Sequence, residues 1–213
     1  MIKLKNFLDK NFSRRNFLSN SAKILTGAAV FGLMPSADAK KRLRVPQISE
    51  LKALDELDIG TVPLEFGEMD LRTHTGAIVL HHTGMRDMDM TVAEIHDLHK
   101  NQNKWSGIGY HFLIHKDGYI ERGRPENTLG AHSLSNNEFT VGICVIGNYD
   151  IGVPTKEQII SAEQLMAALC DKYKFEPSDT TIFGHRDLCP TSCPGKSLYS
   201  LLPGIIENVQ KVF

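Results

Sequence analysis

The chain has 213 residues, 41% of them apolar, and its 24 basic and 25 acidic residues nearly cancel at pH 7. This composition suits one globular domain with a hydrophobic core. Residues 1–39 hold six of the bases and two of the acids, so the rest of the chain has 18 bases, 23 acids and a net charge of −5. A nucleic-acid-binding protein would carry a basic stripe, and we therefore expect no nucleic acid among the partners.

Residues 1–39 predict an export signal. Three lysines open the segment, a moderately apolar run covers residues 22–34, and Ala37-Asp38-Ala39 is typical of a cleavage site. Residues 13–18, SRRNFL, resemble the twin-arginine signal that exports already folded proteins. The alternative is a general secretion signal in which the two arginines are incidental. The apolar run is shorter than the ~20 residues that span a bilayer, so no membrane anchor is expected after cleavage. The protein is predicted to act in the periplasm or outside the cell.

Residues 40–75 have no strong periodicity. Four helix-breaking residues punctuate the segment: Pro46, Gly60, Pro63 and Gly67. We expect a short helix over residues 48–57 and otherwise an extended N-terminal arm packed on the domain.

Residues 76–213 predict one domain of alternating strands and helices. Short apolar runs indicate strands over residues 77–80, 110–114, 119–121, 141–146 and 180–183, and Asp117-Gly118 is typical of a hairpin turn. Helices are expected to begin at the capping boxes of Thr91 and Thr155, and a last helix covers residues 205–212. The predicted fold class is α/β, with a single mixed central β-sheet flanked by helices.

Two histidines follow predicted strands, and a cysteine lies close to the second histidine. His81 follows the strand at 77–80, His185 follows the strand at 180–183, and Cys193 comes eight residues later. Two imidazoles and one thiolate form an open zinc site in which a water takes the fourth position. We therefore predict that Zn²⁺ is bound by these three residues. His82 and Cys189 are the rival ligands, and Cys189 is also a rival disulfide partner of Cys193.

The remaining cysteines and histidines are assigned to ordinary positions. Cys144 lies in an apolar strand and Cys170 on a helix, so both are predicted to be small buried core residues. His96 and His99 share one side of a predicted helix, which is expected to face solvent, with a second metal site as the alternative. His111 and His115 are expected to face solvent or a loop.

Five motifs stand in a characteristic order. They are IVLHHT at 78–83, GIGYHFLI at 107–114, GAH at 130–132, VGI at 141–143 with IGNY at 146–149, and GHRD at 184–187 with TSCPG at 191–195. Over roughly residues 76–205 the chain resembles the type 2 N-acetylmuramoyl-L-alanine amidases, a family that includes phage amidase lysozymes and peptidoglycan recognition proteins.

The resemblance implies the same three zinc ligands and adds further site residues. It implies that Tyr110 is the catalytic partner of the metal, that Thr191 stabilises the developing oxyanion, and that His132 lines the substrate groove. A phenol is a weak base at neutral pH, so we assign Tyr110 a positioning and hydrogen-bonding role. Arg124 is expected to bind substrate or to pair with an acid. Glu121 is the nearest candidate for a carboxylate base.

The resemblance therefore predicts an exported zinc amidase that cleaves the bond between N-acetylmuramic acid and L-alanine in peptidoglycan. Its partners would be peptidoglycan or muropeptides in the periplasm or cell wall, and we expect a monomer. The first alternative is a peptidoglycan-binding recognition module without catalysis, and the second is an unrelated exported zinc peptidase.

Overall fold

The computed structural model describes residues 45–85 and 89–213, so the export signal predicted for residues 1–39 lies outside the described residues. The elements follow in chain order as β1 (Ile59–Thr61), β2 (Ala77–His82), α1 (Val92–Asn101), β3 (Phe112–Ile114), β4 (Ile120–Arg122), β5 (Thr140–Val145), α2 (Lys156–Tyr173), β6 (Ile182–Gly184), α3 (His185–Leu188) and α4 (Lys196–Val212).

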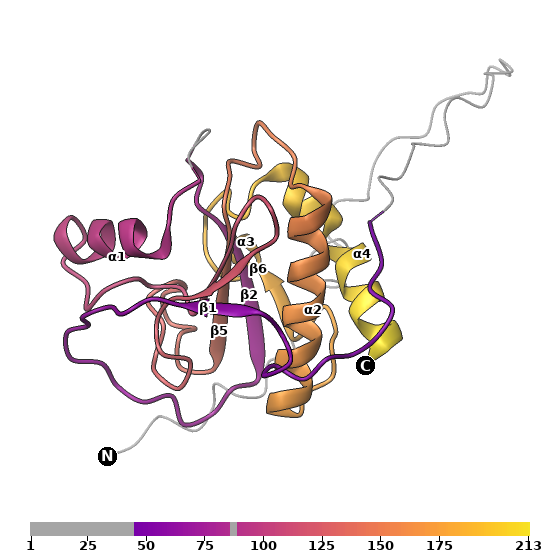
Figure 1. Cartoon of the computed structure of the whole chain (residues 1–213), viewed down its shortest axis with the longest axis horizontal. Coiled ribbons are helices and arrows are strands. Elements are labelled where there is room, and N and C mark those ends of the chain that lie inside the picture. The colour runs from indigo at the N-terminus through magenta and orange to yellow at the C-terminus, as the bar shows by residue number, and fades with distance from the viewer. Residues whose placement is uncertain (1–44, 86–88) are drawn as a thin grey trace, which may run out of the picture. The chain divides into compact units, whose positions relative to one another are not determined.

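The strands form one six-stranded sheet in the order β1-β4-β3-β5-β2-β6. Figure 1 labels β1, β2, β5 and β6 of this sheet. The β3–β4 hairpin is antiparallel, and every other neighbouring pair is parallel. A mixed central sheet flanked by helices confirms the predicted fold class. The central strands β2 and β5 are buried along their whole length, as expected for strands that are covered on both faces.

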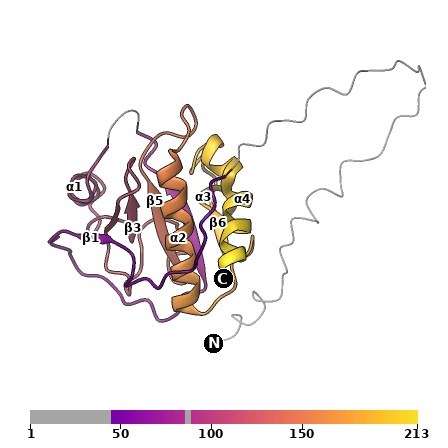
Figure 2. The same ribbon diagram turned by 45° about the vertical axis from the view of Figure 1, so that its right-hand side comes forward.

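Helices cover both faces of the sheet (Figure 2). Ile78 and Leu80 of β2 pack against α2 and α4 in the larger hydrophobic cluster. On the other face a smaller cluster joins Ile95 of α1 to Leu113 and Cys144 of the sheet. Because side chains alternate along a strand, the odd-numbered residues of β2 face the α1 side, and this places His81 on that side.

Two helices begin where their capping boxes predict. At the start of α1, the Thr91 hydroxyl oxygen accepts from the Glu94 backbone N–H, and the Glu94 carboxylate accepts from the Thr91 backbone N–H. Thr155 and Gln158 exchange the same pair of bonds at the start of α2. Each box satisfies backbone donors that a helix start leaves without intrahelical partners.

The N-terminal arm departs from its prediction in two ways. The helix predicted over residues 48–57 is wrong: the chain is extended and then turns at residues 54–57. Ile48 and Leu54 are both buried in the larger cluster, and their six-residue spacing suits an extended strap better than one helical face. The arm also supplies β1, which pairs in parallel with β4 at the sheet edge. Within the described residues no helix is both long enough and apolar enough to span a membrane.

Candidate metal centre

The three predicted ligands meet at one end of the sheet. His81 is the fifth residue of β2, and His185 directly follows β6, whose Gly184 pairs with Leu80 of β2. Cys193 lies in the loop after α3. One donor atom from each of the three side chains lies within 4.8 Å of the others. Two neighbouring parallel strands and the loop that follows one of them therefore bring the three donors together.

The donor set fits zinc. The His81 Nδ1 and Cys193 Sγ atoms are 3.6 Å apart. Two ligands of a tetrahedral zinc ion with ordinary Zn–N and Zn–S bonds are roughly 3.5 Å apart. The imidazole rings of His81 and His185 have centroids 4.5 Å apart. Two imidazoles and a thiolate form a soft set that prefers zinc over magnesium or calcium.

Backbone contacts hold the cysteine in place. The backbone N–H of His82 donates to Cys193 Sγ at 3.4 Å. The Cys193 carbonyl accepts from the backbone N–H of Arg186 at 2.9 Å and from Arg186 Nε at 3.3 Å. Gly195 has φ = 87°, and a Cβ there would lie 2.5 Å from the Tyr149 carbonyl carbon. The glycine therefore lets the ligand loop pass close to the segment after β5.

The pKa values of the three candidate ligands are shifted in directions that suit metal binding. Burial, and then the neighbouring His185, lower the pKa of His81, and burial lowers the pKa of His185. Both imidazoles are therefore neutral near pH 7, which is the state that binds metals. Burial raises the pKa of Cys193 to about 11, against the opposing effect of the His82 N–H. A thiol in such a site releases its proton when a metal ion binds.

The structure separates the predicted ligands from their rivals. His82 points to the opposite face of β2, where its Nδ1 accepts from the Tyr149 backbone N–H at 3.2 Å. The Cys189 Sγ lies 3.6 Å from Ser133 Oγ. All four cysteines, in the part of the chain that is described, are free thiols, so no disulfide joins Cys189 to Cys193. Cys144 and Cys170 are fully buried, as predicted.

Tyr110 lies beside the ligands. Its ring centroid is 5.2 Å from that of His81. Burial, followed by the neighbouring thiols of Cys144 and Cys193, raises the pKa of Tyr110 well above its ordinary value. The phenol therefore keeps its proton and is suited to donate a hydrogen bond.

Thr191 lies in the ligand loop. Its side chain is exposed, and its Oγ1 accepts from the Cys193 backbone N–H at 3.2 Å. Because this contact uses the oxygen as an acceptor, the hydroxyl proton stays available for a second partner.

Two predicted substrate contacts, Arg124 and His132, are largely buried and held by contacts inside the protein. Arg124 is 6% exposed and donates to three backbone carbonyls, those of Ile108, Leu129 and Gly107. It ties two loops together, pairs with no acid among the described residues, and lines a cavity of about 240 Å³ together with Phe66 and Arg122. His132 is 7% exposed, and its Nδ1 lies 3.1 Å from Nε2 of His81. It contacts the ring nitrogen of His81 that does not face Cys193.

The solvent-facing positions predicted for three other histidines are also wrong. His96 and His99 of α1 are buried, and they accept bonds from the backbone N–H groups of Ile108 and Gly109 at 3.3 and 3.0 Å. His111 is buried and accepts from the Gly142 N–H at 2.9 Å. Backbone donors from distant segments satisfy these rings, and no local pattern in the sequence reveals such partners.

The candidate base Glu121 is used elsewhere. Its Oε2 accepts from His115 Nε2 at 2.7 Å and from the Val92 backbone N–H at 3.3 Å. The carboxylate thus caps the start of α1. It also binds His115, which lies between β3 and β4 in the hairpin to which Glu121 belongs. His115, which was predicted to face solvent or a loop, is half-buried in this pair.

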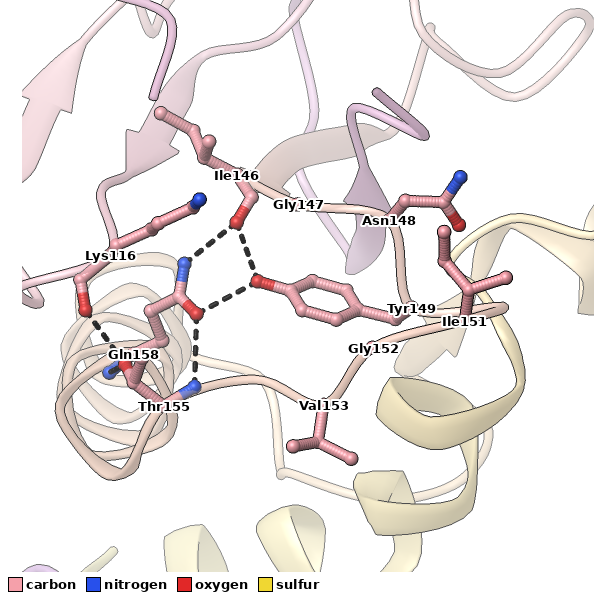
Figure 3. A pocket seen from close by; sticks show the side chains of 10 residues that line it. All are labelled: Lys116, Ile146, Gly147, Asn148, Tyr149, Ile151, Gly152, Val153, Thr155 and Gln158. Carbon is pink, nitrogen blue, oxygen red and sulfur yellow. Dashed lines mark hydrogen bonds between the residues drawn. The ribbon is translucent and has the colours of Figure 1, made fainter. Parts of the chain in front are cut away.

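A cavity of about 370 Å³ adjoins the segment after β5 but contains none of the three ligands (Figure 3). Its polar groups bond mainly to one another. The Tyr149 hydroxyl lies 2.6 Å from the Ile146 carbonyl and 2.8 Å from Gln158 Oε1, and Thr155 Oγ1 donates to the Lys116 carbonyl at 2.8 Å. These bonds fix the connection between β5 and α2. They also hold Tyr149, whose backbone N–H donates to His82 Nδ1.

Comparisons with known proteins show the family of this chain. The sequence model of the N-acetylmuramoyl-L-alanine amidase family matches residues 72–196. Human N-acetylmuramoyl-L-alanine amidase is 28% identical over 151 residues, which are 67% of this chain and 26% of the human protein. This chain thus corresponds to about a quarter of that relative. The endolysin of Klebsiella phage KP32 is 33% identical over 129 residues, which are 60% of this chain and 85% of the endolysin.

Solved structures lead to the same family. The endolysin N-acetylmuramoyl-L-alanine amidase of Clostridium intestinale matches with a TM-score of 0.60 and 37% identity, over 65% of this chain and 88% of that one. Peptidoglycan-recognition proteins of Drosophila are also among the matches. The chain belongs to the N-acetylmuramoyl-L-alanine amidase family, whose members include endolysins and peptidoglycan-recognition proteins.

Proposed function

We propose that this protein is a zinc-dependent N-acetylmuramoyl-L-alanine amidase that hydrolyses the amide between the lactyl group of N-acetylmuramic acid and L-alanine in peptidoglycan. The observation that carries the proposal is the convergence of His81, His185 and Cys193 within 4.8 Å. A recognition module has no need of a three-donor site, whereas amide hydrolysis needs an activated water and charge stabilisation at the carbonyl.

Each side chain has a defined part in this reaction. His81, His185 and Cys193 would hold zinc, which lowers the pKa of a bound water and polarises a carbonyl. Tyr110 keeps its proton and donates a hydrogen bond that orients the reacting groups. Thr191 offers its hydroxyl proton to the developing oxyanion. A neutral hydroxyl stabilises that charge less than a lysine would.

We also propose that the protein is exported and acts as a monomer on peptidoglycan or muropeptides in the periplasm or cell wall. The support is the SRRNFL segment at 13–18 followed by the cleavage pattern at 37–39. Export in the folded state would let the site load zinc in the cytoplasm, where thiols such as Cys193 stay reduced.

The competing function is a recognition module that binds peptidoglycan without cleaving it, and the presence of peptidoglycan-recognition proteins among the matches favours testing it. The test is to incubate the purified protein with muropeptides, detect free stem peptide by mass spectrometry, and quantify zinc per chain. Cys193→Ala is the test variant. Cys189→Ala, four residues earlier in the same loop, is the matched control.

We expect stem peptide and about one zinc per chain from the wild type and from Cys189→Ala, and neither from Cys193→Ala. Zinc-loaded wild type that releases no peptide would leave the recognition module as the function. Release of peptide without bound zinc would overturn the metal assignment. Cleavage within peptides that lack a muramyl sugar would identify a peptidase instead.

A further inference from the structure

His81 presents its two ring nitrogens to different partners. Nδ1 lies 3.6 Å from Cys193 Sγ, on the side where the three ligands converge. Nε2 points the other way and lies 3.1 Å from Nδ1 of His132. The two rings meet edge to face, with an interplanar angle of 80°. The nitrogen that faces the ligands is therefore Nδ1, and His132 contacts the opposite nitrogen.

This contact selects one tautomer of His81. A neutral imidazole carries its proton on one nitrogen only, and the nitrogen that binds a metal must offer a lone pair. The proton of His81 must then be on Nε2, where it donates to Nδ1 of His132. In the reverse arrangement His132 would donate, the His81 proton would be on Nδ1, and the lone pair needed for the metal would be lost.

The interior of the domain is built to hold His132 in this pose. A Cβ on Gly142 would lie 2.5 Å from the His132 ring, and one on Gly130 would lie closer still. The two glycines thus form a slot of ring thickness. His111 closes the slot edge to face at 5.5 Å, and the backbone N–H of His132 donates to Asn137 Oδ1 at 3.1 Å.

The slot itself is anchored to the sheet. His111 Nδ1 accepts from the Gly142 backbone N–H, so its proton is on Nε2, where it donates to the Thr128 carbonyl at 3.1 Å. The neighbouring Arg72 guanidinium carries only donors. Its Nη1 lies 3.0 Å from His111 Nε2 and donates to the carbonyls of Thr128 and Thr140. The His111 side of the slot is therefore fixed by backbone contacts that do not depend on a ligand. Nε2 of His132 itself is buried and has no hydrogen-bond partner among the described residues.

We propose that His132 is a positioning residue for the metal site, which acts by accepting the Nε2 proton of His81 and so directing the His81 Nδ1 lone pair at the ion. This inference rests on the proposed zinc site. Metal-binding histidines commonly donate the N–H of their second ring nitrogen to a carboxylate, carbonyl or water. Loss of that partner lowers metal affinity about 10- to 100-fold. Here a neutral, buried imidazole takes that place.

The test is the zinc dissociation constant of the purified protein, measured by competition with a chromophoric chelator. His132→Leu fills the slot without an acceptor and is expected to weaken zinc binding about 10- to 100-fold. His132→Asn keeps an acceptor oxygen at the position of Nδ1 and is expected to restore much of that loss. The visible spectrum of the cobalt(II)-loaded protein should change in His132→Leu and return toward wild type in His132→Asn.

His96→Leu is the matched control. His96 is as buried as His132 and bonds the backbone N–H of Ile108, but His81 is not among its contacts. Its substitution is expected to lower the melting temperature of the apoprotein and leave the zinc dissociation constant unchanged. An equal loss of affinity in His96→Leu, or none in His132→Leu, would overturn the role of His132 alone. A wild type that binds no zinc would overturn the metal site as well.

Discussion

Glu163 of α2 is the most deeply buried carboxyl group among the described residues, and it makes the stability of the domain depend on pH. Its side chain is 0% exposed. Its Oε1 accepts a bond from Asn208 Nδ2 of α4 at 2.8 Å, and the same Asn208 amide donates to the Pro46 carbonyl of the N-terminal arm. The contact thus joins two helices and the arm in one place.

Burial raises the pKa of Glu163 from 4.5 to about 7, although the Asn208 hydrogen bond opposes the shift. Between these values the folded protein keeps a proton that the unfolded chain has released. The free energy of unfolding therefore falls as the pH rises through this window, and the loss is complete above about pH 7. At ~1.4 kcal/mol per pH unit, the penalty amounts to roughly 3 kcal/mol.

Glu163→Gln removes this titration, because the amide has the shape of the neutral carboxyl group and no charge to lose. We expect wild type and variant to have the same stability near pH 4.5. At pH 8 the variant should be more stable by roughly 3 kcal/mol, which is about 6–12 °C in melting temperature for a domain of this size.

The assay is denaturant unfolding followed by circular dichroism at several pH values, with the variant compared with wild type at each pH. Glu207→Gln is the control, because Glu207 is an exposed partner of Lys211 on α4 and such surface pairs contribute under about 1 kcal/mol. If the difference between Glu163→Gln and wild type does not change from pH 4.5 to pH 8, the protonated, buried carboxyl is refuted.

Three further predictions concern the site and its support. Tyr110→Phe should slow amide hydrolysis about 100-fold with zinc content unchanged. Burial raises the pKa of Tyr110, so the phenol does not titrate near neutral pH. Tyr110→Phe should therefore keep the pH dependence that the wild-type rate shows in this range, and a variant that loses this pH dependence would contradict the protonated phenol. Gly142→Ala should weaken zinc binding about 10-fold by displacing His132, whereas Gly152→Ala, in an exposed loop, should bind zinc as wild type does; equal affinities in chelator competition would refute the slot. Arg124→Met should lower the free energy of unfolding by about 3 kcal/mol, because three carbonyls lose their donor; urea titration that shows no loss would refute this stabilising role of Arg124.

The secondary structure of the domain was largely predictable because its signals are local. The capping boxes at Thr91 and Thr155 involve residues three apart. The apolar run of β5 indicates a strand that is covered on both faces. A helix over residues 48–57 failed because local composition does not distinguish a helical face from a strap whose apolar residues enter the core at wide intervals.

The convergence of the three candidate donors was also predictable, because the strand that carries His81 and the strand that His185 follows lie side by side. The choice between His81 and His82 follows from strand alternation, which is a property of covalent geometry. Only the structure decides which nitrogen of His81 faces the cysteine, because that depends on the ring rotation that His132 fixes.

The sequence by itself determined the fold class, the order of the elements and the identity of the converging donors, since periodicity, capping and motif spacing operate over a few residues. The tertiary structure alone decided the burial of His96, His99, His111 and His132 and the structural use of Arg124. Burial of a polar side chain is stable only when a donor or acceptor awaits it. For His111 that donor is the Gly142 N–H, 31 residues away in sequence.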